Sequence, residues 1–439
     1  MGRRLFRKLK APLHVFIEVT GNCNLGCKHC YNHWRDLGKQ LNCSASKHMS
    51  EALANQVMDQ VIEAEVLSVC LTGGEPLSNY KIVKLILERC KGTRIKVTMN
   101  SNVTLLTEQR LQELKDLRLF GFFTSVLGSS SQVHDTITGV NGSFEKTINA
   151  IKLCHQFGFI IHPNMVVSRL NLEDILQTAK MLKNIGCQGM NLDTASCPVN
   201  CSDFSELALT REEQLKVFNS MLWIESNLGM SVRATTRIPY CIFPELNGFE
   251  LFLYSKCTAG IALLSISSDG EVRVCPKDSS GNVGLLTNSN LLEIWRGLED
   301  YRTDVRIPYK CKACKLLPKC GSGCRFAALQ ATGKIDGQDP LMNADGTIQA
   351  YKLLQGYMQN KIHNVLQARQ IIFNDFVLRD EEFGAVVWDG SNMQLINKDG
   401  SNLLRTVRPG IAYSLDDSMF INCKNFIQSL AISGLLTVN

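Results

Sequence analysis

Short apolar runs and longer segments with helical periodicity alternate along the first 230 residues. Runs rich in β-branched and aromatic residues predict strands at 13–20, 66–72, 94–99, 122–127, 159–167 and 189–193. Apolar residues spaced three and four apart predict helices at 50–63, 79–89, 107–117, 143–157, 172–185 and 210–228. Six successive strand–helix units favour parallel strands joined by right-handed crossovers. We therefore predict an α/β fold, a partial (β/α)6 TIM-like barrel, although periodicity also allows a flat doubly wound sheet.

Polar motifs follow four of the predicted strands. Cys23–Cys30 follows the first strand, Gly73–Pro76 the second, Asn100–Asn102 the third and Gly128–Ser130 the fourth. Parallel α/β folds build their sites at the carboxyl ends of strands. The four motifs are therefore predicted to meet at one site.

Composition and charge exclude several functional classes. The chain is 45% hydrophobic and 20% charged, which is typical of globular proteins. Its net charge of +6 is too small to indicate nucleic-acid binding. It has no apolar run long enough to span a membrane and no secretory signal. We therefore expect a cytoplasmic protein with no nucleic-acid or membrane partner.

Cysteine is the unusual residue, with 18 in 439 positions. A chain of this length without an export signal is not a disulfide scaffold, so spaced cysteines are predicted metal ligands. The other cysteines, Cys241 among them, are mostly isolated in the sequence. The nine cysteines in spaced groups are Cys23, Cys27, Cys30, Cys257, Cys275, Cys311, Cys314, Cys320 and Cys324.

The first group has the spacing C-x3-C-x2-C over Cys23, Cys27 and Cys30. Three thiolates on one short loop can hold three corners of a cubane iron–sulfur cluster. A structural zinc with His29 or His33 as its fourth ligand is an alternative, as is a catalytic zinc with a bound water.

This motif resembles that of the radical SAM enzymes, with His29 at a position that is usually aromatic. The resemblance implies that the three cysteines hold a [4Fe–4S] cluster whose fourth iron chelates S-adenosyl-L-methionine. Reductive cleavage then yields a 5′-deoxyadenosyl radical that abstracts a substrate hydrogen. The resemblance covers roughly residues 12–230.

Gly73-Gly74-Glu75-Pro76 is the second feature of the resemblance. Paired glycines let a backbone approach a ligand closely, and Glu75 could accept from the cofactor ammonium. The family usually reads Ser-Leu-Asp where this chain has Ser125-Val126-Leu127. The cofactor-binding residues implied by the resemblance are His29, Gly73, Gly74, Glu75, Pro76, Asn100 and Ser125.

A third stretch runs from His134-Asp135 through Gly139 to Gly142-Ser143-Phe144. It resembles one that is common in peptide-modifying radical SAM enzymes. A loop followed by a helix N-cap at Ser143 is the simpler interpretation.

The later cysteines resemble the SPASM extension of radical SAM enzymes, which holds one or two auxiliary [4Fe–4S] clusters. A hairpin turn at 267–272 would bring Cys257 and Cys275 together. The full family pattern has a seventh cysteine, but none lies between Cys324 and Cys423. One auxiliary cluster is therefore missing, open or completed by another ligand, for which the candidates are Asp336, Asp339 and Asp345. A zinc knuckle at 311–324 is an alternative.

The C-terminal segment is predicted as a bridging helix at 346–375 and a winged-helix-like α+β domain at 376–439. Hairpin strands at 383–388 and 393–397 and a helix at 422–433 resemble the PqqD-like peptide-recognition domain. Such domains bind a leader peptide as an added edge strand; a capping subdomain without a ligand is the alternative. The predicted domains before it are the radical SAM barrel at 1–230 and the iron–sulfur domain at 231–345.

Together these features indicate a radical SAM maturase acting on a ribosomally made precursor peptide with a leader. Crosslinking, thioether formation, epimerisation and excision all remain open. Cys197 and Cys201 are candidate hydrogen donors, and a flavodoxin or ferredoxin is the expected electron donor. The alternatives are a sulfatase-maturase-like enzyme acting on a folded protein or small molecule, and a zinc-stabilised binding scaffold.

Overall fold

The computed structural model describes residues 2–32, 48–196, 204–243, 257–278, 281–343, 352, 370–390, 392–420 and 423–438. They belong to two compact units, Met1–Thr347 and Ile348–Asn439. Each unit is described by itself.

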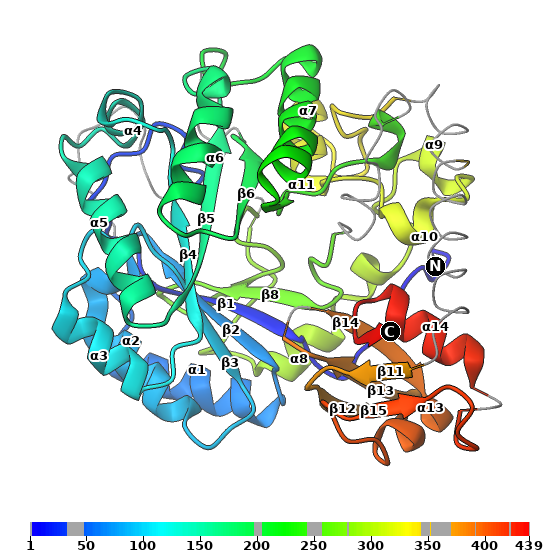
Figure 1. The fold of residues 1–439 in the computed structure, drawn as a ribbon. Coiled ribbons are helices and arrows are strands. Elements are labelled where there is room, and N and C mark those ends of the chain that lie inside the picture. Colours follow the sequence, from blue (N-terminus) through cyan, green and yellow to red (C-terminus); the bar gives the residue numbers. More distant parts are fainter. Residues whose placement is uncertain are drawn as a thin grey trace. The chain divides into compact units, whose positions relative to one another are not determined.

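Seven parallel strands in chain order form the main part of a ten-stranded sheet in the first unit (Figure 1). The consecutive neighbours from β1 to β7 differ from a doubly wound sheet, in which the strand order reverses at a switch point. The predicted partial barrel is therefore confirmed. A short seventh strand was not predicted. The strands are β1 (His14–Thr20), β2 (Ser68–Gly73), β3 (Lys96–Asn100), β4 (Gly121–Ser125), β5 (Ile160–Val167), β6 (Gly189–Thr194) and β7 (Ser231–Arg233).

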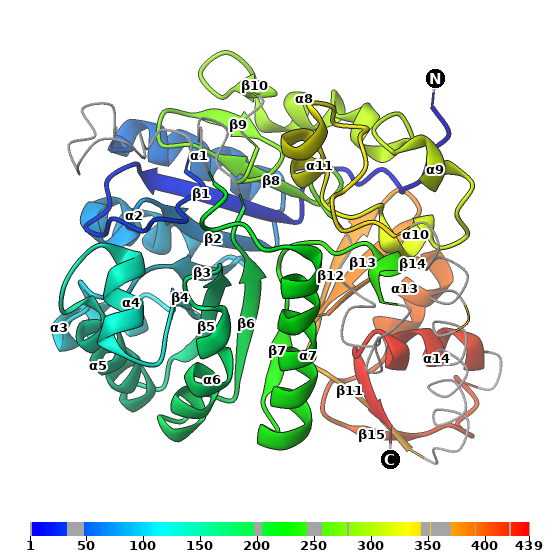
Figure 2. The same cartoon turned by 90° about the horizontal axis from the view of Figure 1, so that it is seen from above.

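Helices connect these strands along the outer side of the curved sheet (Figure 2). Several begin at side-chain caps: the Ser50 hydroxyl accepts from Leu53 N at 3.2 Å, and Thr210 forms a capping box with Glu213. Helix α4 was not predicted. The helices are α1 (Glu51–Glu63), α2 (Tyr80–Cys90), α3 (Glu108–Asp116), α4 (Ser131–Thr138), α5 (Ser143–Gln156), α6 (Ile175–Asn184) and α7 (Arg211–Leu228).

The two faces of the sheet differ in chemistry, as the strand register shows. One face carries buried apolar side chains packed towards the helices, which include Ile17, Leu71, Met99, Phe122, Met165 and Leu192. The opposite, inner face carries mainly polar residues near the carboxyl ends of the strands, among them Glu18, Thr72, Asn100, Ser125, Asn164 and Asn191. A polar interior is typical of a barrel that holds a ligand rather than a packed core.

The cysteine-rich segment extends the same sheet. Strand β8 (Leu263–Ile266) pairs parallel with β1, and β9 (Glu271–Arg273) and β10 (Gly284–Leu285) follow antiparallel. The β8–β9 turn confirms the predicted hairpin. The segment continues through α8 (Leu291–Arg296), α9 (Tyr309–Lys312), α10 (Leu317–Cys320) and α11 (Arg325–Thr332).

A buried ion pair joins this extension to the inner face of the barrel. The guanidinium of Arg273 on β9 contacts the carboxylate of Glu18 on β1, and the two side chains are 2% and 4% exposed. Burial raises the pKa of Glu18 to about 7, although Arg273 opposes the shift. Arg273 also donates to the carbonyls of Pro276 and Asp278 at 3.3 and 3.4 Å, which positions the backbone just after Cys275.

The second unit contains two three-stranded antiparallel sheets. The first has the order β15 (Ala412–Ser414), β11 (Gln370–Phe373) and β16 (Leu436–Val438). The second has the order β12 (Val377–Glu381), β13 (Gly384–Trp388) and β14 (Met393–Asn397). Helices α13 (Lys398–Leu404) and α14 (Lys424–Ile432) complete a core whose members include Phe373, Val387, Phe420, Ile427 and Leu430.

The predicted hairpin at 383–397 and the helix at 422–433 are found in this unit, within a residue or two of their expected ends. Residues 370–373 form strand β11, so the bridging helix predicted for 346–375 does not extend over them. Pairing of β11 with two other strands satisfies its backbone groups and places it inside the C-terminal unit. Apart from Lys352, the predicted bridging helix before residue 370 lies outside the described residues.

The Glu18–Arg273 pair gives a stability prediction. Arg273→Met leaves the Glu18 carboxyl buried without its cation, so we expect the free energy of unfolding to fall by about 3–5 kcal/mol. Urea denaturation of the iron-free protein measures this change. Glu18→Leu/Arg273→Met removes both buried charges and is expected to recover most of the loss. A double variant no more stable than Arg273→Met would contradict this account.

Candidate functional site

The loop that carries Cys23, Cys27 and Cys30 follows β1 and is held by its backbone. Gly26 N donates to the Thr138 carbonyl at 2.7 Å, and Lys28 N donates to the Ile137 carbonyl at 2.9 Å. Both carbonyls belong to the end of α4. All three cysteines are partly exposed, so their sulfurs remain accessible beside the barrel mouth.

The paired glycines bring the end of β2 against this loop. Gly74 N donates to the Thr20 carbonyl, and Glu75 N donates to the Asn22 carbonyl, each at 2.7 Å. A Cβ on Gly73 would lie 2.2 Å from the Thr20 oxygen, and one on Gly74 would lie 2.1 Å from the Asn22 oxygen. No larger side chain fits there, so both glycines are required by the approach of two backbones.

Glu75 is fully buried, and its carboxylate is hydrogen-bonded to the neighbouring strand ends. Its Oε1 accepts from Leu77 N at 3.0 Å and from the Ser101 hydroxyl at 2.7 Å, and its Oε2 accepts from Asn102 N at 2.8 Å. Burial raises the pKa of this carboxyl, and these hydrogen bonds lower it. Glu75 therefore ties the ends of β2 and β3 together, and its contact with a cofactor ammonium stays a prediction.

Asn102 extends this connection to the first cysteine. Its Nδ2 lies 3.9 Å from Cys23 Sγ and donates to Asn24 Oδ1 at 2.8 Å. Asn24 in turn donates to the Thr104 hydroxyl at 2.8 Å. Sequence analysis placed Asn102 after β3 but did not identify it as a support of the cysteine loop.

Asp135 explains the third motif. Its carboxylate accepts from Gly142 N, the Ser143 hydroxyl and Phe144 N, at 2.7, 2.7 and 2.8 Å. These bonds fix the turn between α4 and α5, and with it the α4 carbonyls that hold the cysteine loop. The N-cap of α5 is Gly142 rather than Ser143, because the Ser143 side chain is directed to Asp135.

His134, which is buried, packs against the same turn. Its Nδ1 accepts from Leu127 N at 3.2 Å, and its ring packs against Phe144 with centroids 5.8 Å apart. Burial lowers the pKa of His134 to about 4, so the ring is neutral near pH 7 and acts as an acceptor.

The remaining predicted cofactor residues lie around this mouth. Asn100 ends β3, Ser125 ends β4 and Pro76 begins a short 3-10 helix, Pro76–Asn79. His29 is buried in the cysteine loop. The candidate hydrogen donors Cys197 and Cys201 lie outside the described residues, and their role stays a prediction.

Three of the later cysteines lie near enough to one another for their thiols to interact electrostatically. Burial raises the pKa of Cys275 to about 12, with a further contribution from the neighbouring Cys257 and Cys324. Burial and the nearby Cys324 also raise the pKa of Cys257. We call Cys257, Cys275 and Cys324 the three-cysteine group.

Tyr31 directly follows the first cysteine group and has neighbours in both cysteine regions. Burial raises its pKa, and Glu18, Cys30 and Cys275 raise it further. The two cysteine regions therefore both lie near Tyr31.

Two of the predicted acidic ligands have other surroundings. Asp339 is buried, and its carboxylate accepts from Cys324 N at 2.7 Å and Leu341 N at 2.9 Å, so it holds the backbone of the last cysteine. Asp336 is exposed. Asp345 lies outside the described residues.

The donor set of both regions fits iron–sulfur clusters. Thiolates are the protein ligands of such clusters, and the three cysteines of the first loop are partly exposed. Among the described residues, no three His, Cys, Asp or Glu side chains lie close enough to bind one metal ion directly. Ligands of a cluster need not lie so close, because the cubane itself separates them.

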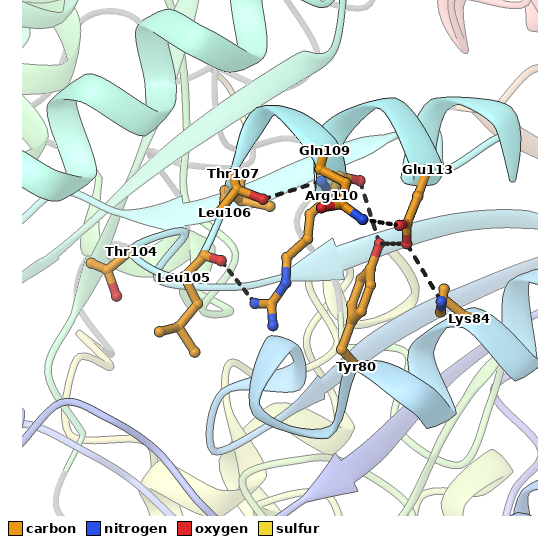
Figure 3. A pocket seen from close by; sticks show the side chains of 9 residues that line it. All are labelled: Tyr80, Lys84, Thr104, Leu105, Leu106, Thr107, Gln109, Arg110 and Glu113. Carbon is orange, nitrogen blue, oxygen red and sulfur yellow. Dashed lines mark hydrogen bonds and ion pairs between the residues drawn. The ribbon is translucent and has the colours of Figure 1, made fainter.

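A surface pocket lies between α2 and the loop that leads into α3 (Figure 3). Its polar side chains mostly contact one another. The Tyr80 hydroxyl donates to Glu113 at 3.0 Å, Lys84 lies 3.5 Å from the same carboxylate, and Arg110 donates to the Leu105 carbonyl at 2.8 Å. We therefore do not assign this pocket to the candidate site.

Comparison with known proteins agrees with the geometry. Residues 17–182 match the radical SAM superfamily, and residues 257–324 match SPASM, an iron–sulfur cluster-binding domain. The chain is a radical SAM enzyme with a SPASM domain. Its cofactors are S-adenosyl-L-methionine and [4Fe–4S] clusters. The zinc alternatives are thereby set aside.

Individual relatives of this radical SAM enzyme differ in their named activities. An AdoMet-dependent heme synthase of Oleidesulfovibrio alaskensis is 26% identical over 74% of this chain and 85% of the relative. The PqqA peptide cyclase of Bradyrhizobium diazoefficiens is 24% identical over 75% of this chain and 85% of the relative. The structure of Streptococcus suis SuiB bound to precursor peptide SuiA matches with a TM-score of 0.60 and 18% identity, covering 76% of each chain. Among the described residues, no helix is long and apolar enough to cross a membrane.

The glycine approach gives a direct test of the radical SAM site. Gly74→Ala places a methyl group on the Asn22 carbonyl oxygen, so we expect the cysteine loop to shift and the protein to lose ~4 irons, one cubane. Iron quantitation after anaerobic reconstitution measures the loss. Gly297→Ala is the matched control, because the nearest atom to its new Cβ lies 3.4 Å away. Equal iron content in the two variants would contradict this role of Gly74.

Proposed function

We propose that this radical SAM enzyme matures a ribosomally made precursor peptide. The observation that carries the proposal is the convergence of three motif-bearing strand ends at the polar mouth of an open barrel. The cysteine loop, the Gly73–Pro76 stretch and Asn102 are joined there by direct contacts. Similarity to a PqqA peptide cyclase and to SuiB, which binds a precursor peptide, supports a peptide substrate.

Each part of the site has a proposed role. Cys23, Cys27 and Cys30 hold the cluster that binds S-adenosyl-L-methionine, and the Gly73–Pro76 backbone binds the cofactor. When bound, this pair supplies a radical able to remove a hydrogen atom from a peptide carbon. Asn100 and Ser125, at the ends of adjacent strands, orient the cofactor or the substrate on the polar inner face. The six later cysteines hold auxiliary iron.

The surroundings of the cysteine loop also assign positioning roles. Glu75, Asn102 and Asp135 keep the loop and the neighbouring strand ends in register. A fixed loop is needed because small displacements of the reacting groups reduce rates strongly.

We further propose that the C-terminal unit binds the leader of the precursor. Its two sheets are small, and in the part of the chain that the structure describes β12 and β14 each pair on one side only. An extended peptide can add to such an edge through main-chain hydrogen bonds. The core of the unit consists of its own residues, consistent with a separate recognition domain.

The clusters and their reductant suggest the cellular setting. Clusters of this type and free cysteines persist in a reducing compartment, so we propose a cytoplasmic enzyme. A flavodoxin or ferredoxin is the proposed electron donor.

Heme synthesis is a second candidate function, because the matched heme synthase covers a similar share of this chain. A sulfatase-maturase-like action on a folded protein or small molecule is a third. Peptide maturation and heme synthesis are distinguished by their substrates. The substrate that increases 5′-deoxyadenosine formation above the level without substrate is a candidate precursor peptide in the first case and a porphyrin in the second.

The leader proposal predicts a specific loss of activity. The full chain should process a precursor with its leader at least ~10-fold more efficiently in kcat/KM than the same peptide without it, since leader binding supplies affinity. A chain ending at Thr347, the boundary of the first unit, should process both peptides at the lower rate. Its substrate-free cleavage of S-adenosyl-L-methionine serves as the control for folding. Equal leader dependence in both proteins would overturn this role for the C-terminal unit.

A further inference from the structure

Two closed auxiliary clusters would need two more ligands than the SPASM match supplies. The SPASM match at 257–324 contains six cysteines, whereas a closed four-iron cluster takes four cysteines. The three-cysteine group uses Cys257, Cys275 and Cys324, which leaves Cys311, Cys314 and Cys320. Cys423 belongs to the other unit, so it is not placed relative to these residues.

Cys241 lies outside the SPASM match but is next to these three cysteines. It is the middle residue of a short 3-10 helix, Tyr240–Ile242. The preceding residue contacts the cysteine set directly, because Tyr240 N donates to Cys320 Sγ at 3.4 Å. The helix is fixed in place, since Tyr240 and Ile242 are each 1% exposed.

A second chain segment contacts both Cys241 and the same set. Asn343 N donates to Cys241 Sγ at 3.3 Å, and the sulfur of the adjacent Met342 lies 4.0 Å from Cys311 Sγ. Two separate backbone segments therefore bring Cys241 to one end of the Cys311–Cys320 region.

The thiols that act electrostatically on one another divide the seven cysteines in the same way. The thiols that act on Cys241 are Cys320 and Cys314, and those that act on Cys311 are Cys320, Cys241 and Cys314. For Cys257 the neighbouring thiol is Cys324, and for Cys275 the neighbouring thiols are Cys257 and Cys324.

The backbone around Cys320 is shaped to stabilise negative charge on sulfur. Gly321, Ser322 and Gly323 have φ angles of +68°, +66° and +73°. The N–H groups of Ser322 and Gly323, with that of Tyr240, are directed to the Cys320 thiol. Successive N–H groups in such a turn form an anion-binding nest, a feature of many iron–sulfur sites. A left-handed non-glycine residue such as Ser322 costs stability, which indicates a functional constraint.

We propose that Cys241, Cys311, Cys314 and Cys320 are the four protein ligands of one closed auxiliary [4Fe–4S] cluster. This inference rests on the proposed binding of auxiliary iron by the later cysteines. Cys311, Cys314 and Cys320 supply three ligands, and Cys241 supplies the fourth. The three-cysteine group then holds a separate cluster, to which the described residues contribute three thiolates.

The test uses the full chain with Cys23, Cys27 and Cys30 replaced by Ala, so that only auxiliary iron is counted. After anaerobic reconstitution we expect ~8 irons in this parent, at four per cubane. Adding Cys241→Ala or Cys314→Ala should each remove the same ~4 irons and the same EPR signal of the reduced protein. Cys275→Ala should remove the other signal. Cys154→Ala is the control and should keep both signals. Cys154 is a buried core cysteine, and no other cysteine contributes to its pKa shift.

The outcomes separate this inference from the broader proposal. If the parent holds ~8 irons and Cys241→Ala matches Cys154→Ala in iron and EPR signal, Cys241 is not a ligand, and the auxiliary clusters stand without it. If the parent binds no iron, the proposed auxiliary clusters fall together with the inference. Circular dichroism of each variant, compared with Cys154→Ala, distinguishes ligand loss from unfolding. Cys241→Ser, which keeps nearly the volume of the side chain, should show the same loss of signal.

Discussion

The close approach of two backbones at the ends of β1 and β2 is the contact on which the rest of the site depends. The Thr20 and Asn22 carbonyls accept hydrogen bonds from Gly74 and Glu75, and any side chain at either glycine would overlap with these oxygens. This contact places the cysteine loop, and Glu75 then connects it to the end of β3. Asp135 fixes the turn that holds the loop from the other side.

The barrel is connected to the auxiliary region by buried side chains as well as by the pairing of β8 with β1. Glu18 on the inner face of the barrel meets Arg273, which holds the carbonyls that follow Cys275. Both Cys30 and Cys275 lie near enough to Tyr31 to raise its pKa. The barrel and the cysteine-rich segment share a sheet and a compact unit.

Much of the fold could be predicted from sequence because its signals are local. Strand and helix periodicity identified six of the parallel strands and most of the helices, and the C-x3-C-x2-C spacing identified the loop. Three-residue β7 and eight-residue α4 are too short to give a clear period. Strand β11 follows a segment with helical periodicity, and only its pairing with β15 and β16 identifies it. Other features depend on contacts between segments that are distant in the sequence. Spacing alone could therefore not predict that Glu75 binds Ser101, nor that Cys241 lies near other cysteines.

The central claim is that Cys23, Cys27 and Cys30 make this chain a radical SAM enzyme. The most direct measurement is 5′-deoxyadenosine formation from S-adenosyl-L-methionine by the anaerobically reconstituted, reduced full chain, beside a variant with all three cysteines replaced by Ala. The account predicts 5′-deoxyadenosine from the wild type and none from the variant, together with the loss of ~4 irons. Equal product from both proteins, or none from a wild type that carries its full iron, would contradict it.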